Sequence, residues 1–333
     1  MSFYRPLLLC SVALTFLVIV VGAYVRLEDA GLGCPDWPGC YGQLLGVPDE
    51  AHEVLRAEQA FPGKSVDPGR AWKEMFHRYL AGTLGILILA VAVIAWRSRE
   101  EIGRTPWLAS ALLLLVALQA TLGMWTVTML LQPVIVTLHL LGGMATFALL
   151  LWLALREIHP QPAPAAAARA LRPWAAVGLV LLVVQVALGG WVSTNYAALA
   201  CADFPTCHGE WLPAMDFENA FHVLRELGVT AAGTPLSYEA LTAIHWSHRL
   251  GALVTLVYIG GLALWALRTP QLRTTGAALL ALLLAQAGLG IANVLLRLPL
   301  VLAAAHNAGA ALLLAALVML NFTVFKRSPA VAK

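Results

Sequence analysis

Four of the nine histidines in this 333-residue chain lie inside or at the edge of long apolar segments. They are His77, His139, His248 and His306. An ionisable side chain is costly in such surroundings, so its presence there indicates a function. Haem iron takes two axial nitrogens from opposite sides of a flat macrocycle, and two facing imidazoles would supply them. The alternative is that each histidine only makes a hydrogen bond between helices, worth about 0.6 kcal/mol on average in a membrane.

The histidines recur because the chain repeats itself at an offset of 167 residues. The matched segments are 34–40 with 201–207, 119–123 with 286–290, His139 with His306 and, at an offset of 171, His77-Arg78 with His248-Arg249. Residue type and spacing agree at several independent places. Each half therefore has its own four spans and its own pair of histidines, and an even number of spans makes the two repeats parallel.

The pattern predicts one bis-histidine haem site in each half. Zinc would need about four ligands, usually including thiolate or carboxylate, and no such cluster recurs in both halves. Arg78 and Arg249 directly follow two of the histidines and could bind haem propionates through charge-assisted hydrogen bonds. Both arginines could instead extend their charged ends to the outer membrane surface.

One acidic residue breaks the symmetry between the halves. Glu74 stands one turn before His77, and His245 stands at the matching place before His248. Residues at i and i+3 share a helix face, so we expect Glu74 to point toward the group that His77 binds. A glutamate in the first turn of a helix is also favoured by the helix dipole alone. His245 is either a spare ligand or, as we expect, a hydrated histidine at the membrane interface.

Two cysteine pairs with identical spacing lie in the outer loops, Cys34 with Cys40 and Cys201 with Cys207. Disulfide bonds persist outside the bacterial cytoplasmic membrane, and a proline-containing loop could bring each pair together. We expect structural disulfides, while a redox-active pair that passes electrons is the alternative. Cys10, within the first span, is expected to be buried, inert packing.

The elements that must position these residues are membrane-spanning helices. Hydrophobic residues make up 60% of the chain, charged residues make up 12%, and the mean hydropathy is +0.78. A soluble globular protein has about 45–50% apolar and about 25% charged residues. The composition excludes a disordered chain, a disulfide-scaffold toxin and a coiled coil, and a scattered net charge of +3 does not favour nucleic-acid binding. Apolar runs without a period of two favour helices over a β-barrel, so we expect an all-α integral membrane protein.

Eight runs are long enough to cross a membrane, which takes about 20 apolar residues. They are approximately 6–25, 75–96, 106–130, 134–155, 173–194, 244–267, 275–296 and 300–325. The first run lacks a small-residue cleavage site, so we expect a retained span rather than a signal peptide. The pairs Gly142-Gly143 and Gly189-Gly190 fit close helix packing, and no chemistry is assigned to them.

The short connectors on the side of the N-terminus hold 12 of the 21 Lys and Arg residues. These are Arg5, Arg97, Arg99, Arg104, Arg156, Arg169, Arg172, Arg268, Arg273, Lys326, Arg327 and Lys333. The bias predicts that both termini are cytoplasmic and that the two long loops lie outside.

The expected domains follow from this arrangement. An N-terminal four-helix half covers 1–159 with its outer loop at 27–74, and a C-terminal half covers 173–327 with its outer loop at 195–243. Residues 160–172 form the cytoplasmic linker between them, since Pro and Ala are enriched there.

The motifs resemble those of the haem A synthase family, in its bacterial members with cysteine pairs in both long outer loops. The resemblance rests on GLGCPDWP at 31–38 followed by Cys40, on Glu74-x-x-His77-Arg78, and on the second cysteine pair followed by His248-Arg249. It covers nearly the whole chain. It implies oxidation of the methyl group on haem O to a formyl group, giving haem A for terminal oxidases.

The resemblance implies a resident haem b in the C-terminal half, held by His248 and His306 next to Arg249. This haem would pass electrons in. The cysteines Cys34 and Cys40 would take part in electron handling or haem O transfer. The resemblance also implies the bacterial inner membrane and its lipid, with a haem O synthase and cytochrome oxidase assembly factors as partners. It allows a homo-oligomer and implies no nucleic acid.

The N-terminal half would receive the substrate haem O on His77 and His139, next to Arg78, with Glu74 as the catalytic carboxylate. Two successive hydroxylations of the methyl group would give a geminal diol, which loses water to become an aldehyde. A carboxylate near the haem edge could stabilise developing positive charge or relay a proton.

The chain departs from the family pattern in its loops. Glu28-Asp29 stand where small or hydroxyl residues are usual before Gly31, and Phe204 replaces a tryptophan of the second loop. Neither departure touches the predicted ligands, so both bear on loop detail alone.

Two other functions use some of the same features. A dihaem cytochrome b-type, quinol-linked electron carrier would use both bis-histidine sites symmetrically and would not need a lone Glu74. A quinone-linked thiol oxidase would place two cysteine pairs outside a helical bundle, but it would not need four intramembrane histidines.

Overall fold

The computed structural model describes residues 3–99, 106–158 and 164–326, and in these ranges the chain is helical with no strand longer than an isolated bridge. Eight described helices are long and apolar enough to cross a membrane, as predicted. They are α1 (Tyr4–Leu27), α3 (Pro68–Arg97), α5 (Trp107–Thr128), α6 (Pro133–Ile158), α8 (Arg172–Thr194), α10 (Tyr238–Arg268), α11 (Arg273–Leu295) and α12 (Leu300–Phe325). Shorter helices are α2 (Ala51–Ala60), α7 (Ala166–Arg169) and α9 (Phe217–Ala220), with 3-10 turns at Ala197–Leu199 and Pro270–Leu272.

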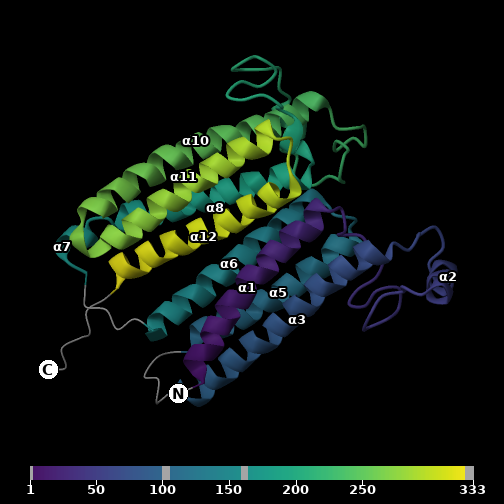
Figure 1. Ribbon diagram of the computed structural model, residues 1–333, viewed down its shortest axis with the longest axis horizontal. Helices are drawn as coiled ribbons and strands as arrows, with labels where there is room; N and C mark the ends of the chain where they lie inside the picture. The colour runs from purple at the N-terminus through teal and green to yellow at the C-terminus, as the bar shows by residue number, and fades with distance from the viewer. Residues whose placement is uncertain (1–2, 100–105, 159–163, 327–333) are drawn as a thin grey trace.

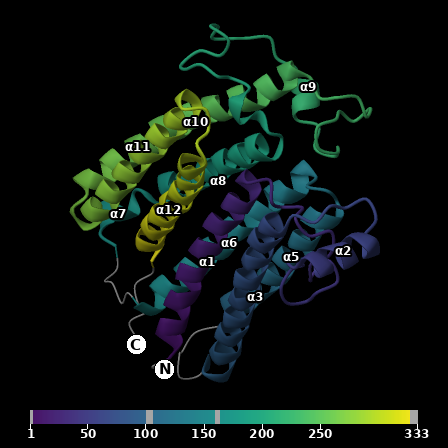
Figure 2. The same cartoon turned by 45° about the vertical axis from the view of Figure 1, so that its right-hand side comes forward.

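The long helices form two neighbouring sets (Figures 1 and 2). In the first set, α1 and α5 each pack against α3 and α6; in the second, α8 and α11 each pack against α10 and α12. The sets meet where α12 contacts α1 and α6, and where α6 contacts α8. The start of α1 and the end of α12 lie at one end of the molecule, and the two long loops lie at the other.

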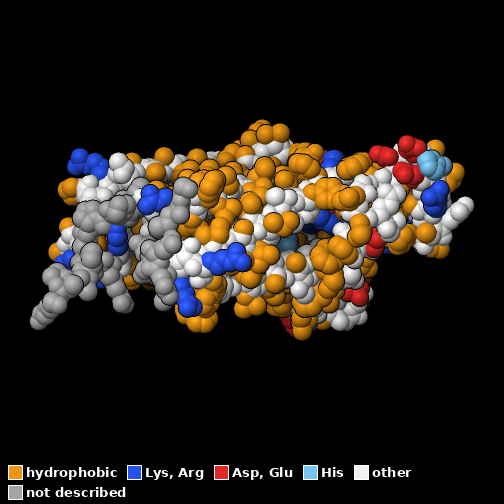
Figure 3. Space-filling view, turned by 90° about the horizontal axis from the view of Figure 1, so that it is seen from below, with side chains coloured by type: hydrophobic (Ala, Val, Ile, Leu, Met, Phe, Trp, Pro, Cys, Tyr) orange, Lys and Arg blue, Asp and Glu red, His pale blue; other side chains and the backbone are white. Residues whose placement is uncertain are grey.

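Helix α12 is the most enclosed span, because 56% of its most apolar window is buried against 22–33% for the other seven. Its leucine and alanine side chains contribute much of the largest hydrophobic cluster. The outward faces of the other helices carry exposed apolar residues such as Ile86, Val180 and Val257. Such faces require lipid rather than water around them, and Figure 3 shows hydrophobic side chains covering the middle of the molecule.

Two helices begin earlier than predicted. Helix α3 starts at Pro68, where Asp67 caps the backbone N–H of Arg70 at 3.0 Å, and α10 starts at Tyr238, where Ser237 caps Ala240 at 3.1 Å. Charged residues in these first turns hid the extensions from a search for apolar runs. A 30-residue helix is about 45 Å long, against about 30 Å of hydrocarbon core, so these turns extend past the apolar region.

The backbone supports the internal repeat independently of residue type. Left-handed φ angles recur at positions 167 apart. The pairs are Asp29 with Tyr196, Tyr41 with His208, Leu130 with Arg297 and Leu131 with Leu298. Residues with side chains rarely adopt such angles, so the repeated loops share their local conformation. The division into domains at 160–172 remains a prediction, and residues 159–163, Arg104, Arg327 and Lys333 lie outside the described residues.

Candidate functional site

Each of the four histidines lies against a glycine on the long helix that precedes its own. A Cβ atom added at Gly22 of α1 would lie 2.8 Å from Cε1 of His77, so a larger residue there would push the ring away. The same arrangement pairs Gly123 with His139 (3.4 Å), Gly189 with His248 (3.0 Å) and Gly290 with His306 (3.2 Å). The imidazoles are therefore directed at neighbouring helices and not at lipid.

The histidines fall into two pairs, one in each set of helices. His77 and His139 lie on α3 and α6 of the first set, and His248 and His306 lie on α10 and α12 of the second. Nδ1 of His77, His139 and His306 is buried without a hydrogen-bond partner in the described chain. No group of three or more His, Cys, Asp or Glu among those residues could hold a bare metal ion. A haem needs only two protein ligands, because the porphyrin supplies the other four nitrogens.

Glutamines approach both histidines of the C-terminal half. Nε2 of Gln185 lies 3.0 Å from Nδ1 of His248 and donates to the His248 carbonyl at 3.1 Å. Nε2 of Gln286 lies 3.4 Å from Nε2 of His306 and donates to the His306 carbonyl at 2.9 Å. The ring nitrogen without a glutamine contact is Nε2 in His248 and Nδ1 in His306. Sequence analysis missed this role of the glutamines, although Gln286 lies in a repeated segment.

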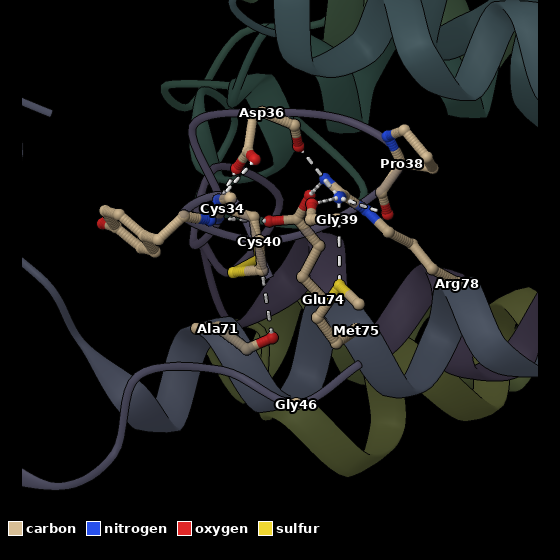
Figure 4. The surroundings of a disulfide bond; sticks show 12 residues. Cys34, Asp36, Pro38, Gly39, Cys40, Gly46, Ala71, Glu74, Met75 and Arg78 are labelled. Carbon is tan, nitrogen blue, oxygen red and sulfur yellow. Dashed lines mark hydrogen bonds and ion pairs between the residues drawn. A yellow bond between two sulfur atoms is a disulfide. The ribbon is translucent and has the colours of Figure 1, made fainter. Parts of the chain in front are cut away.

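Glu74 is buried at the base of the first disulfide loop (Figure 4). Its carboxylate accepts a hydrogen bond from the backbone N–H of Cys34 at 2.9 Å and forms an ion pair with Arg78. The Arg78 guanidinium also donates to the carbonyls of Asp36 (2.9 Å) and Gly39. Glu74 and Arg78 therefore join the start of α3 to the disulfide loop.

The second half builds the same junction with different chemistry. Nδ1 of His245 accepts a hydrogen bond from the backbone N–H of Cys201 at 3.2 Å, and Nε of Arg249 lies 3.2 Å from Nε2 of His245. Arg249 donates to the carbonyls of Cys201 (2.7 Å) and Thr206 (2.8 Å). The expectation of a hydrated His245 was wrong: its exposed fraction is 4%, because the loop covers it.

Both cysteine pairs are disulfide-bonded, with a Cα–Cα distance of 4.8 Å in each. An aspartate closes each loop: Asp36 accepts the backbone N–H groups of Tyr41 and Gly42, and Asp203 accepts those of His208 and Gly209. Hydrogen bonds from Thr206 and from these backbone groups lower the pKa of Asp203. Cys10 is exposed on the outer face of α1, so the expectation that it is buried was wrong.

The unusual loop residue Asp29 lies at the contact between the halves. It accepts a hydrogen bond from the Tyr196 hydroxyl at 2.8 Å and pairs with Arg26 at 3.4 Å. Arg26 donates to the Ser193 carbonyl at 2.8 Å, and its guanidinium lies 4.0 Å from the centre of the Tyr196 ring. Arg26 with Ser193 and Asp29 with Tyr196 are matched positions of the repeat, so equivalent residues meet across the contact.

The sequence of the chain is similar to a known protein family over most of its length. A family model described as "Cytochrome oxidase assembly protein" matches residues 5–318. The chain belongs to this family. Curated relatives of the chain carry the name heme A synthase. The relative from Shewanella oneidensis is 42% identical over 98% of each chain. The relative from Caulobacter vibrioides is 29% identical over 91% of this chain and 90% of its own, and that from Rhodospirillum centenum is 31% identical over 94% and 85%.

The two halves of the chain offer different surroundings to a bound group. The C-terminal histidines have glutamine partners, and an imidazole lies at the base of their loop. The N-terminal histidines have a carboxylate at the matching place, paired with an arginine. An open groove of about 400 Å³ between α1 and α3 is lined by Val21, Tyr24, Trp72, Lys73 and Phe76.

Proposed function

We propose that this protein is a haem A synthase, which oxidises the methyl group of haem O to a formyl group and so produces haem A for terminal oxidases. The observation that carries the proposal is 42% identity to a heme A synthase over 98% of both chains. Four imidazoles seated on glycines, in two pairs, support it because haem iron needs paired nitrogen ligands. The enzyme is then an oxidoreductase acting on a carbon–hydrogen group.

In this proposal the two halves do different work. His248 and His306 hold a resident haem b, which supplies electron transfer when bound. His77 and His139 hold the substrate haem. The division is supported by the glutamine contacts that the C-terminal rings receive and the N-terminal rings lack.

Glu74 is the catalytic carboxylate of the proposal. It is one helical turn from His77, it is buried, and Arg78 balances its charge. A group in this position can hold a proton beside the reacting methyl group or stabilise positive charge that develops there. Its contact with the Cys34 amide ties that function to the shape of the first disulfide loop.

Arg78 and Arg249 are proposed to lie at the propionate edges of the two haems. The guanidinium N–H groups of both arginines already donate to backbone carbonyls of the disulfide loops. A haem propionate would therefore bind to a guanidinium that also holds its loop. The disulfides Cys34–Cys40 and Cys201–Cys207 hold those loops closed, and a redox role for Cys34–Cys40 stays a hypothesis.

The protein is proposed to lie in the bacterial inner membrane with both termini cytoplasmic, as the distribution of Lys and Arg on the short connectors predicts. Haem O would then come from a haem O synthase, and haem A would pass to oxidase assembly factors. Lipid surrounds the eight spans.

Extraction and chromatography of the bound haems test the proposal. Haem B together with haem O or haem A is expected from the purified protein. Haem B alone would favour an electron carrier, and a protein without any haem absorption would leave only the thiol oxidase. Conversion of added haem O to haem A by the purified protein with an electron donor provides the second measurement.

A further inference from the structure

Three of the four histidines belong to a larger motif that spans two helices. The first helix carries Gln-x-x-x-Gly, and the second carries His-x-x-Gly. The occurrences are Gln119, Gly123, His139 and Gly142 on α5 and α6; Gln185, Gly189, His248 and Gly251 on α8 and α10; and Gln286, Gly290, His306 and Gly309 on α11 and α12. The first glycine seats the imidazole, and the second seats the glutamine.

The second glycine is required by the glutamine side chain. A Cβ atom built at Gly142, Gly251 or Gly309 would overlap the amide group of the glutamine from the facing helix. The amide therefore occupies space that only glycine leaves open. In the C-terminal half this position brings Nε2 of Gln185 within 3.0 Å of the His248 ring and Nε2 of Gln286 within 3.4 Å of the His306 ring.

The fourth histidine lacks both parts of the motif. On α1 and α3, Val18 stands at the glutamine position and Leu80 at the second glycine position, while Gly22 still seats His77. Nδ1 of His77 is buried without a hydrogen-bond partner in the described ranges, as Nδ1 of His139 and of His306 is, but no glutamine amide is placed beside the His77 ring. The exception falls on the helix that also carries Glu74.

We propose that Gln185 and Gln286 are positioning residues that retain haem in the C-terminal half, and that Val18 and Leu80 make His77 an exchangeable ligand. This inference rests on the proposed function, in which one haem stays and the other must leave as product. Each glutamine amide contacts the imidazole and donates to the backbone carbonyl of the same histidine, which restricts rotation of the ring. Losing an outer partner of a metal-ligating histidine typically weakens metal binding 10–100-fold. An imidazole without such a partner rotates away from iron more readily.

In the N-terminal half, His139 has the glutamine of the motif, Gln119, but no hydrogen bond joins the two side chains. The Gln119 amide overlies Gly142 as the other glutamines overlie their glycines, but its Nε2 and Nδ1 of His139 are both buried without partners. His139 would therefore be the better held of the two N-terminal ligands, and His77 the one that exchanges.

The test uses the full-length protein purified in detergent and measures haem loss to excess apomyoglobin, with chromatography to identify the haem released. Gln185→Met keeps the side-chain length but removes the amide, so haem B should leave about 10–100-fold faster. Val180→Met, on the exposed face of the same helix α8, is the control and should leave haem B release unchanged.

The reciprocal variant Val18→Gln/Leu80→Gly installs the motif beside His77 and should slow the release of haem O or haem A. The ferric low-spin electron paramagnetic resonance signal should also shift in Gln185→Met, which a packing defect alone would not cause. Unchanged release of haem B by Gln185→Met, or unchanged release of the N-terminal haem by the double variant, would overturn the inference. A protein without any haem would instead overturn the proposed function. If Gln185→Met does not fold, the double variant decides.

Discussion

The carboxylate of Glu74 accepts a hydrogen bond from the backbone N–H of Cys34 at 2.9 Å, and His245 accepts the equivalent bond from Cys201 at 3.2 Å. The residue that distinguishes the halves thus occupies one structural place in both of them. Each is followed four residues later by an arginine that binds it and the loop carbonyls. The loop needs an acceptor at this place, but it does not need a carboxylate, so the acid in one half calls for a chemical explanation.

Replacing Glu74 separates its two roles. Glu74→His places the imidazole of the second half at this position and should keep the hydrogen bond from the Cys34 amide, so the protein should fold and retain haem b. Its rate of haem O conversion should fall at least about 100-fold, because proton transfer by a positioned side chain contributes that much or more. Conversion is measured by chromatography of extracted haems. The control His245→Glu should retain conversion. Full activity in Glu74→His would contradict the catalytic assignment.

The glycines beneath the imidazoles should control haem binding in one half at a time. Gly189→Ala places a Cβ atom 3.0 Å from Cε1 of His248 and should lower the haem B content, measured as the ratio of Soret to protein absorbance. Gly22→Ala should do the same for the N-terminal haem. Gly82→Ala is the control, since a Cβ atom there meets nothing within 4 Å. Equal haem loss in all three variants would contradict this view.

The contact between the halves should contribute to stability through a coupled pair. Arg26→Ala removes the bond to the Ser193 carbonyl and the contact with the Tyr196 ring, and Tyr196→Phe removes the bond to Asp29. Each should lower the free energy of unfolding by about 1 kcal/mol. In the double variant the losses should not add, because both changes affect one cluster. Chemical unfolding in detergent measures all three, and strict additivity would argue against coupling.

The second disulfide loop should loosen in acid. Hydrogen bonds from Thr206 and backbone N–H groups lower the pKa of Asp203. A group with a lowered folded pKa stabilises above its unfolded pKa of about 3.9 and loses that contribution as the pH falls through the folded value. Proteolysis of residues 195–243 should therefore increase with falling pH below about 4. Asp203→Asn should remove this dependence, and an unchanged profile would show that another group is responsible.

The sequence by itself determined the features that depend on short stretches of chain. Eight apolar runs predicted eight spans because length and hydropathy alone decide whether a helix can cross a membrane. The repeat predicted the pairing of the cysteines, which the two disulfides confirm, since a duplicated segment keeps its spacing. The family followed from the same motifs.

The tertiary structure decided where side chains point. Cys10 faces outward, His245 is buried and Glu74 binds the loop, because the direction of a helix face depends on which helices surround it. The glutamine contacts were hidden for the same reason: Gln185 and His248 are 63 residues apart, and only the packing of α8 against α10 joins them. A short sequence motif is enough to identify a candidate ligating residue. The groups that hold this residue in place come from the helix that packs beside it, which only the tertiary structure shows.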